Sequence, residues 1–365
     1  MFAKFFKAPT LTSKFTDDML FATDRIVSYE YTKRFSKVGE FVMVLPFDLD
    51  FLKVLKINGT ITIDGDWLWI QNIGFDGRQI TVGGKDCKGF LDTRIVLPSS
   101  TSAKGADGYD VISGPTRTCI RHYIEKHCID PADENRKLPL VWGGGAEGLR
   151  NDSYMARFEY VSEVVTALCD NANIGYDITG NLSGGGFSFV TIHGVDRSFA
   201  QSENPRVIFS SQWGNIVSQN YEHGVDNLFN VIYGTDTDGY TKSVYRDNNV
   251  FAGVSRRECN VDVSATIEDE YFDKYALNNV QDNIETHSYE VGAAVSSGYS
   301  TEYHLGDIVT VKDDFTGNLF NAVITEVTKS YSQGEKTFSL VLGQQKAKPL
   351  NKIVNNMINQ TMRRR

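Results

Sequence analysis

The residues best suited to chemistry are two cysteines and two histidines in the segment CIRHYIEKHC, residues 119–128. Cys119, His122, His127 and Cys128 are all of types that bind zinc. The segment is predicted to be helical, and side chains on a helix turn by roughly 100° per residue, which places His122 and His127 about 140° apart. Cys128 would lie opposite Cys119, so one ion cannot gather all four ligands. We therefore predict core cysteines, surface histidines and no metal site.

Other catalytic signatures are weak or missing. GGGAEG, residues 143–148, has the glycine spacing of a dinucleotide-binding loop, G-x-G-x-x-G. That motif needs a strand leading into the glycines and a helix starting on them, whereas LRNDSY separates these glycines from the next predicted helix. A linker loop is the favoured interpretation. No G-x-S-x-G nucleophile motif is present. We predict no catalytic residue, no cofactor-binding residue and no cofactor.

Acidic and amide side chains gather in EYHLGDIVTVKDDFTGNLFNAVITEV, residues 302–327. They form either a site or the turns of a sheet. Apolar residues alternate on both sides of DDFTGN, which predicts a β-hairpin, and Asp, Gly and Asn are preferred in turns. We therefore predict a hairpin loop at 313–318 and a turn at Gly306 that leads into the first strand. The residues in question are Asp307, Asp313, Asp314 and Asn318.

The composition is that of a globular chain of two or three domains, with 365 residues and 41% hydrophobic residues. The net charge of −9 argues against specific nucleic-acid binding, because affinity for phosphates comes mainly from Lys and Arg. Five cysteines without tight pairing indicate a reduced compartment or core positions. No segment approaches the roughly 20 apolar residues of a membrane helix, and no export signal is recognisable, so we expect no membrane insertion.

The elements that would position these residues are mostly strands at first. RIVSYEYTKRFSKVGEFVMVLP, residues 25–46, alternates apolar and polar residues and predicts a hairpin. NGTITIDGDWLWIQNIGFDGRQITVGG, residues 58–84, predicts three short strands separated by Asp64–Gly65 and Asp76–Gly77. The first hundred residues are therefore predicted to form a β-domain.

A mixed unit is predicted from about residue 105 to 200. PTRTCIRHYIEKHCI and SYMARFEYVSEVVTALCDNA read as helices, and GYDITG and GFSFVTIHG as strands. Strand signals return after residue 205, a polar helix is predicted at about 266–297, and NKIVNNMINQTMRRR predicts an amphipathic helix in the tail.

The first and last parts of the chain share a pattern. Gly59-Thr-Ile-Thr-Ile, Ile70-Gln-Asn-Ile and Ile80-Thr-Val-Gly83 are followed much later by Gly306-Asp-Ile-Val-Thr-Val, Ile324-Thr-Glu-Val and Leu340-Val-Leu-Gly343. The order and turn chemistry match, and Gly306–Asp307 takes the place of Asn58–Gly59. The pattern indicates either a duplicated β unit or a chance similarity between hairpins.

The order of these segments resembles siphophage tail-tip proteins that form the baseplate hub. The resemblance rests on the strand pair at Ser28–Pro46 and on ITVGGKDCKGFLDTRIV, FSFVTIHGVDRS and VIFSSQWGNIVSQNYEHGVDNLFNVIYG, then on YHLGDIVTV, AVITEV and FSLVLG. It covers nearly the whole chain. The family is similar to the central hub of contractile-tailed phages.

The resemblance implies an α+β, mainly β fold with two tail-tube-like β-barrels and an inserted α+β domain. The first barrel would span 1–100, completed by strands from about 205–235. The inserted domain would span 101–200, the second barrel 201–345 and the tail 346–365. The structural turns of the duplicated barrels would be Gly59, Gly83, Gly306, Asp307 and Gly343.

The implied function is structural, without enzyme activity. Three chains with two equivalent barrels give six positions, so a homotrimer would match a sixfold tail tube. Located at the virion tail tip after assembly in the host cytoplasm, it would join the tail tube or distal tail protein to spike or receptor-binding proteins. It would also line the channel for DNA and the tape measure protein.

Two alternatives remain open. One is a tail-associated cell-wall hydrolase, since paired carboxylates meet only in the fold. The chain ends soon after Gly343, which leads us to expect wall cleavage and receptor binding in partner proteins. The other is a host-carbohydrate-binding module that uses Trp67, Trp69 or Trp213 to stack on sugars.

Overall fold

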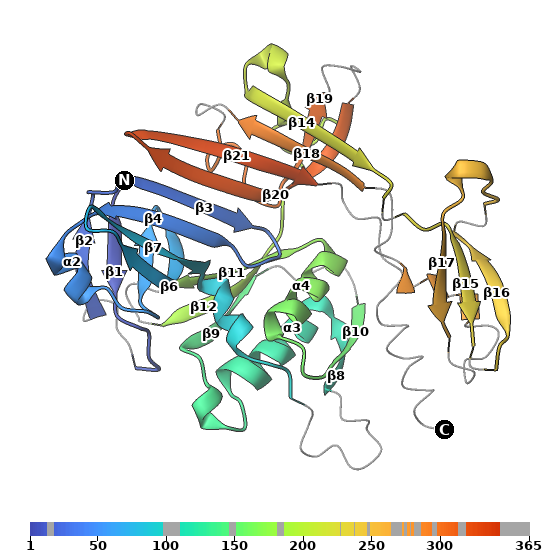
Figure 1. Cartoon of the computed structure of the whole chain (residues 1–365), viewed down its shortest axis with the longest axis horizontal. Helices are drawn as coiled ribbons and strands as arrows, with labels where there is room; N and C mark the ends of the chain where they lie inside the picture. Colours follow the sequence, from blue (N-terminus) through green and yellow to red (C-terminus); the bar gives the residue numbers. More distant parts are fainter. Residues whose placement is uncertain are drawn as a thin grey trace.

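Figure 1 shows the computed structural model of the chain, whose fold is α+β and mainly β, as predicted. Three units follow one another along the chain: a first β unit (residues 1–97), a mixed unit (110–192) and a second β unit (207–343). The structure describes residues 1–12, 18–97, 110–145, 151–180, 186–226, 228–236, 238–246, 249–263, 272–273, 276–277, 279–280, 286–293, 298–312 and 319–343.

The first β unit is a series of antiparallel hairpins, as predicted. Its strands pair β3 with β4, β5 with β6 and β6 with β7. At the β5–β6 turn Asp64 and Gly65 have positive φ angles of 48° and 87°, which suits Asp-Gly. The elements are β1 (Ala3–Phe6), β2 (Met19–Thr23), β3 (Ser28–Arg34), β4 (Glu40–Pro46), α2 (Leu49–Val54), β5 (Thr60–Ile63), β6 (Asp66–Phe75), β7 (Gln79–Asp86) and a 3-10 helix (Cys87–Thr93).

The mixed unit packs two helices against a three-stranded sheet, β11-β12-β9. The predicted helix over 153–172 is wrong in its first part, because the chain there pairs with β8 and then bends at Phe158, where φ is 60°. The elements are β8 (Asp110–Pro115), α3 (Thr116–Ile124), a π-helix (Glu125–Ile129), a 3-10 turn (Glu134–Arg136), β9 (Leu140–Gly145), β10 (Asn151–Ala156), α4 (Val161–Ala172), β11 (Gly175–Gly180) and β12 (Phe187–Ile192).

The described part of GGGAEG, Gly143–Gly145, is the end of β9 and not the predicted linker loop. β9 runs parallel to β12. A Cβ atom on Gly143 would lie 2.7 Å from Val190 Cγ1, so glycine lets the two strands approach closely. Residues 146–150 fall outside the described ranges.

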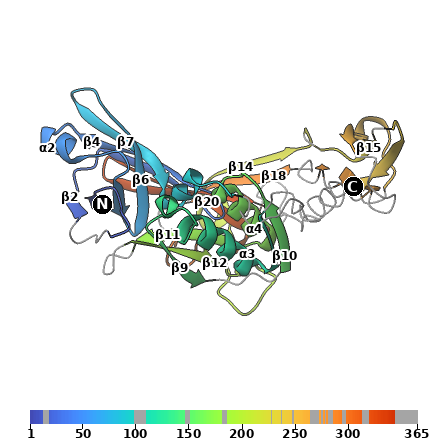
Figure 2. The same ribbon diagram turned by 90° about the horizontal axis from the view of Figure 1, so that it is seen from below.

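The second β unit is built from distant segments, and a small three-stranded lobe extends from one end of it (Figure 2). The unit contains β13 (Ile208–Phe209), a 3-10 turn (Ser211–Trp213), β14 (Ile216–Gly224), β18 (Thr286–Ala293), β19 (Ile308–Lys312), β20 (Leu319–Ser332) and β21 (Glu335–Gly343). The lobe contains β15 (Val231–Thr235), β16 (Thr241–Tyr245), a 3-10 turn (Gly253–Ser255) and β17 (Glu258–Asp262).

Two expectations for this region need correction. The strands within 205–235 do not pair with the first β unit: β13 pairs with β19, β14 with β18, and β15 within the lobe. The predicted helix at 266–297 cannot extend to its end, because 286–293 hydrogen-bonds to β14 on one edge and β21 on the other. The hairpin loop at 313–318 and the tail at 346–365 lie outside the described residues.

The two β units share one 13-stranded sheet. Its order is β14-β18-β21-β20-β3-β4-β7-β6-β5-β1-β2, with β19 and β13 attached to β20. The joint is β20, whose residues Glu326–Ser332 pair with β3, so that red and blue strands lie side by side in Figure 1. Among the described residues these pairings form an open path. No described helix has both the length and the apolar character of a membrane span.

The two β units repeat the same turn. In the first, Asn58 N–H donates to Ile70 O and Ile70 N–H donates to Gly59 O, both at 2.9 Å. In the second, Gly306 N–H donates to Ile324 O at 2.8 Å and Ile324 N–H donates to Asp307 O at 3.0 Å. Asn58 and Gly306 both have positive φ, 67° and 94°. The predicted correspondence of Asn58–Gly59 with Gly306–Asp307 is confirmed.

The strands after this turn also correspond. β6 carries a bulge between Ile70 and Asn72, and β20 carries one between Ile324 and Glu326. Ile70 lies opposite Gly84, whereas Ile324 lies opposite Leu342. The last strands of the two repeats are therefore offset by two residues from the alignment that the sequence suggested, which preserves the face on which each side chain lies.

Candidate functional site

A group of interacting charges lies where the three units meet. We call the four residues involved, Lys33 of β3, Asp66 of β6, Asp177 of β11 and Lys329 of β20, the charged junction. Lys33 Nζ lies 3.1 Å from Asp66 Oδ1 and 2.6 Å from Asp177 Oδ2, and Lys329 Nζ binds the second oxygen of Asp66. One ammonium group thus links the first β unit to the mixed unit, and another links it to the second β unit.

The charged groups of the junction are mostly buried, so their ion pairs are little screened by water. The side chains of Lys33, Asp66 and Asp177 are 18%, 6% and 17% exposed. Burial alone would lower the pKa of Lys33, but Asp177 and Asp66 hold that pKa above its ordinary value. Burial alone would raise the pKa of Asp177, yet Lys33 and Lys88 hold it below its ordinary value. Lys33 and Asp177 are therefore charged at neutral pH, and removing one of them leaves a partly buried charge without its partner.

A second buried pair lies beside the junction. Lys88 Nζ is 3.5 Å from Asp86 Oδ2, and both side chains are almost fully buried. The same Asp86 oxygen accepts hydrogen bonds from Tyr31 Oη at 3.2 Å and Gly39 N at 3.0 Å. Burial raises the pKa of Asp86 above its ordinary value, although Lys88 opposes the shift. This pair fixes the start of the 3-10 helix against the β3–β4 hairpin.

Phe35, just after β3, lies between the three units and contacts each of them. Its side chain is 7% exposed and belongs to the core of the second β unit, with Val327 and Leu340. Its N–H donates to Thr325 O of β20 at 2.9 Å, and its carbonyl accepts from Tyr176 N of β11 at 3.2 Å. The residue thereby joins all three units.

Two glycines leave room for the Phe35 ring. A Cβ atom at Gly175 or Gly306 would collide with the Phe35 ring. Gly306 also has a φ of 94°, a conformation that other residues adopt only with strain. Glycine at these two positions is therefore explained by packing as well as by backbone conformation.

Asp307 anchors the chain that leaves the mixed unit. It is 2% exposed, and its carboxylate accepts hydrogen bonds from Val195 N at 2.7 Å, Arg197 Nε at 2.8 Å and His304 N at 2.9 Å. Three donors around one buried carboxylate hold residues 195–197 against the turn before β19. The chain itself thus supplies three hydrogen bonds to this buried carboxylate.

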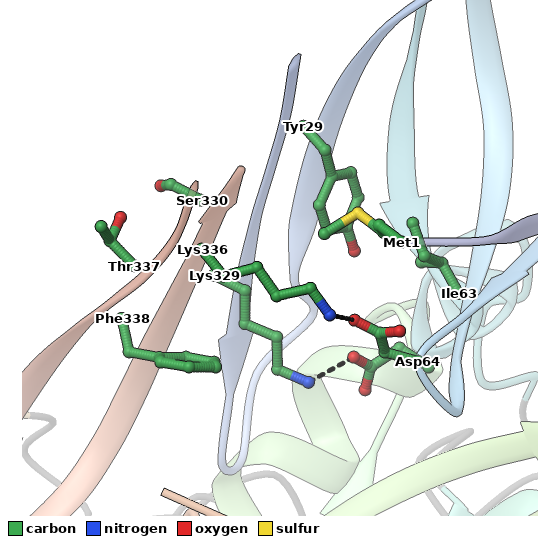
Figure 3. Close-up of a pocket in the computed structure, with 10 residues that line it drawn as sticks. Met1, Tyr29, Ile63, Asp64, Lys329, Ser330, Lys336, Thr337 and Phe338 are labelled. Atoms are coloured by element: carbon green, nitrogen blue, oxygen red, sulfur yellow. Dashed lines mark hydrogen bonds and ion pairs between the residues drawn. The ribbon is translucent and has the colours of Figure 1, made fainter. Parts of the chain in front are cut away.

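A shallow pocket opens next to the junction (Figure 3). Met1, Tyr29, Ile63 and Asp64 line one side, and residues of the β20–β21 hairpin, including Lys336 and Phe338, line the other. Lys336 Nζ reaches across to Asp64 Oδ2 at 2.8 Å, and Lys329 reaches across to Asp66. Both lysines thus link the two β units by ion pairs, and the pocket is lined by residues of both units.

The other predicted turn residues occupy mixed positions. Gly59 precedes β5, where a Cβ atom would lie 2.9 Å from Phe6 O. Gly83 lies inside β7, opposite Val42 and Asn72, and Gly343 is the last residue of β21. The φ angles of Gly83 and Gly343 are not positive, so neither position requires glycine for its backbone conformation. Gly306 and Asp307 are the predicted positions that the fold brings close to the joint.

Two histidines and a lysine of the CIRHYIEKHC segment surround the carboxylate of Asp110. His122 Nε2 and His127 Nε2 lie 2.9 and 2.8 Å from the two carboxylate oxygens of Asp110, and Lys126 Nζ lies 2.6 Å from Oδ1. The prediction that both histidines lie on the surface is wrong for His127, which is 2% exposed. A π-helix over Glu125–Ile129 inserts a wider turn, so residues five apart share a face.

Hydrogen bonds within this cluster shift the pKa of its carboxylate. Burial alone would raise the pKa of Asp110, but hydrogen bonds from His122, His127 and Lys126 hold it well below its ordinary value. Cys119 and Cys128 are buried in the core, as predicted, and burial raises the pKa of Cys128 to about 12. Within the described ranges, no group of three or more His, Cys, Asp or Glu side chains is arranged to hold a metal ion.

The tryptophans proposed for sugar stacking are mostly committed to packing. Trp67 is 6% exposed and its ring contacts Phe6 and Phe187, with centroids 5.4 Å apart in each case. Trp69 packs edge-on against Phe90 at 5.4 Å. Only Trp213 of the three is largely exposed, at 64%.

Sequence reasoning missed the charged junction, but a signal was present. Lys33 follows Tyr29 and Tyr31 on the same face of β3, and both tyrosines are buried. Asp66 shares the buried face of β6 with Leu68 and Ile70. A charged residue on the buried face of an alternating strand predicts a paired charge. The sequence alone does not say which partner it meets.

Comparison with known proteins places the chain in a family. Residues 18–344 match the model of the Siphovirus ReqiPepy6 Gp37-like proteins. The chain belongs to this family. The match covers the first β unit from residue 18 onward and the whole of the other two units, and it confirms the predicted relation to siphovirus proteins. No curated protein matches the sequence.

Three solved structures with a similar fold are described as tail proteins. The 43 kDa tail protein of prophage MuSo2 from Shewanella oneidensis is 13% identical, with a TM-score of 0.57 over 96% of this chain and 100% of that one. A tail protein from Neisseria meningitidis MC58 is 15% identical, with a TM-score of 0.53 over 89% and 93% of the two chains. Prophage tail protein gp18 from Listeria monocytogenes EGD-e is 10% identical, with a TM-score of 0.51 over 100% and 99%. The Gp37-like chain therefore shares the fold of tail proteins, as the resemblance implied.

Proposed function

We propose that this Gp37-like protein is a structural component of the virion tail and forms a trimeric hub at the tail tip. The observation that carries the proposal is the tandem repeat: two β units with the same strand order and turn are joined edge to edge in one sheet. Three such chains offer six equivalent positions, which match a sixfold tail tube. The repeats take the role of the two tube-like barrels that the sequence suggested.

The hub would join the tail tube or distal tail protein to spike or receptor-binding proteins. A chain similar in fold belongs to a complex named PdpA–VgrG, with a TM-score of 0.52 and 8% identity over 95% of this chain and 65% of that one. Its presence in a complex supports the proposal that the Gp37-like chain also works within an assembly. Lining a channel for DNA and the tape measure protein fits a net charge of −9, because an acidic wall does not retain DNA.

The joint between the repeats is suited to this role. The charged junction, Phe35 and Asp307 fix the angle between the two β units and the mixed unit. A ring subunit needs that angle to be constant, because any error is repeated at each interface.

Imaging of whole virions tests the proposal directly. Gold-labelled antibodies against this chain should decorate the tail tip, and averaged images of the tip should show threefold density beneath the sixfold tube. Label confined to the capsid, or a tip ring with a symmetry other than threefold, would contradict it.

The alternative of a cell-wall hydrolase is tested separately. Purified protein should leave peptidoglycan intact in a zymogram, with a lysozyme lane as the control. Clearing that disappears on replacing one Asp or Glu would establish an enzyme instead. A glycan array with the purified chain tests carbohydrate binding, for which Trp213 is the exposed candidate.

A further inference from the structure

Equivalent strand edges differ between the two repeats: a neighbouring strand covers the edge of β20, whereas no described strand covers the equivalent edge of β6. In the second β unit, Glu326–Ser332 of β20 pairs with β3. The corresponding stretch of β6 begins at Asn72, just after the matching bulge. β6 pairs with β5 through Asp66–Trp69 and with β7 through Leu68–Phe75, and no described strand lies on the other side of Asn72–Phe75. This part of β6 is an edge.

The strand that would cover it exists at the far end of the sheet. β14 is the last strand of the described path and pairs only with β18. It corresponds to β3: Tyr31 pairs with Phe41 of β4 as Tyr221 pairs with Tyr289 of β18. The two strands even share residue types in this alignment, SYEYTKR against SQNYEHG. Among the described residues, Asn72–Phe75 of β6 is therefore an uncovered edge, and β14 is a strand equivalent to the one that covers this edge in the other repeat.

We propose that β6 of one subunit pairs antiparallel with β14 of a second copy of this chain. The pairing repeats between chains the β20–β3 pairing within the chain, and it rests on the proposed ring. The register follows from the repeat. Lys329 lies opposite Tyr31 in the chain, and these positions correspond to Phe75 and Tyr221. Phe75 therefore lies opposite Tyr221 of the partner subunit, and Gly74 opposite Glu222 of the partner subunit.

The β6 edge has the properties of an interface. Asn72, Gly74 and Phe75 are exposed, Phe75 by 65%. A Cβ atom at Gly74 would meet nothing within 4 Å, so the edge is open on that side. The stretch NIGF has no Lys and no Pro, the residues that protect solvent-exposed edges from pairing. Pairing there satisfies its outward backbone groups and covers the Phe75 ring.

Geometry closes the assembly. Each chain contributes two repeats and one internal joint, and each contact between chains reproduces that joint. If every joint turns the sheet by the same angle, the six repeats of three chains complete a ring in which the β6 edge and the β14 edge of each subunit are paired. A continuous sheet around the ring follows, with no edge left at β6 or β14.

Disulfide trapping tests the register in assembled tails and in the purified chain. Directly opposed residues have Cα atoms about 4.5–5.5 Å apart, within disulfide range, whereas diagonal pairs are about 7–8 Å apart. Phe75→Cys with Tyr221→Cys should convert most of the chain, on mild oxidation, to a covalent trimer on non-reducing gels. The matched control, Phe75→Cys with Gln219→Cys, is displaced by two residues and should yield about tenfold less. The single variants measure background from the native cysteines.

A second pair protects the test against misfolding. Gly74→Cys with Glu222→Cys addresses the neighbouring position on the other face and should also give the trimer. If neither matched pair forms cross-links in tails whose tip images show a threefold ring, the edge pairing is wrong and the hub stands. If the purified chain cross-links as a trimer but virion imaging finds no label at the tail tip, the pairing stands and the proposed function fails.

Discussion

At the scale of single residues, Lys33 has the largest electrostatic consequence, because its ammonium group lies between two carboxylates from different units. Lys33→Met leaves Asp66 and Asp177 with less compensation at a partly buried site. We expect the free energy of unfolding in urea to fall by about 3 kcal/mol. The control is Lys53→Met, which breaks an exposed Lys–Asp pair with Asp50 and should cost less than about 1 kcal/mol. Equal losses would contradict a special role for the junction.

Asp110 predicts how the protein responds to acid. Its pKa in the folded chain lies below the ordinary value of 3.8, so the unfolded chain binds more protons as the pH falls. The stability due to Asp110 is therefore fully present above about pH 4 and is lost as the pH falls further.

The measurement is the urea midpoint between pH 6 and pH 3. Wild type should lose stability more steeply below about pH 4 than Asp110→Asn, whose profile lacks this carboxylate. Asp130→Asn, at a carboxylate whose side chain is 82% exposed, should retain the wild-type slope. Parallel profiles for wild type and Asp110→Asn would show that the histidine cluster does not act in this way.

At the scale of elements, Phe35 is the point at which the two β units depend on one another. Phe35→Ala should lower the free energy of unfolding by about 3–5 kcal/mol, since it leaves a cavity in the core of the second unit. Phe158→Ala, at a ring that is 54% exposed, should cost far less. Hydrogen exchange of β20 amides should rise in the first variant and not in the second.

Contact between Gly306 and the Phe35 ring predicts an energetic coupling between these two positions. Gly306→Ala introduces a strained φ and a methyl group against the Phe35 ring. The double variant with Phe35→Ala should be more stable than the sum of the two losses by about 1 kcal/mol, because the ring is gone. A double-mutant cycle in urea measures the difference, and strict additivity would rule out the contact.

The same scale shows what sequence patterns can predict. Hairpins β3–β4, β5–β6 and β6–β7 were predictable, because alternation and Asp-Gly turns are local properties. Helix was wrongly predicted for residues 153–156, because β10 is stabilised by its pairing with β8, more than thirty residues earlier. The paired histidines were missed because the spacing argument assumed α-helical geometry, and a π-turn is not visible in composition. The partners Lys33, Asp177 and Lys329 come from three units, and no local pattern joins them.

At the scale of the whole molecule, the acidic balance makes a simple prediction. With 46 acidic and 37 basic residues, the purified chain should not retard duplex DNA in a gel at about 0.1 M salt. A basic DNA-binding protein of similar size serves as the positive control. Retardation that weakens as salt is added would contradict a passive conduit.

The long reach of β20 also constrains the order of synthesis. Thr32 of β3 and Thr328 of β20 share a side-chain hydrogen bond although 296 residues separate them. At about 5–20 residues per second, a ribosome needs on the order of 15–60 s to make that stretch. Throughout this time the nascent β3 has one bare edge, which is open to pairing with other chains. The sheet around β3 can therefore be completed only after β20 has been synthesised.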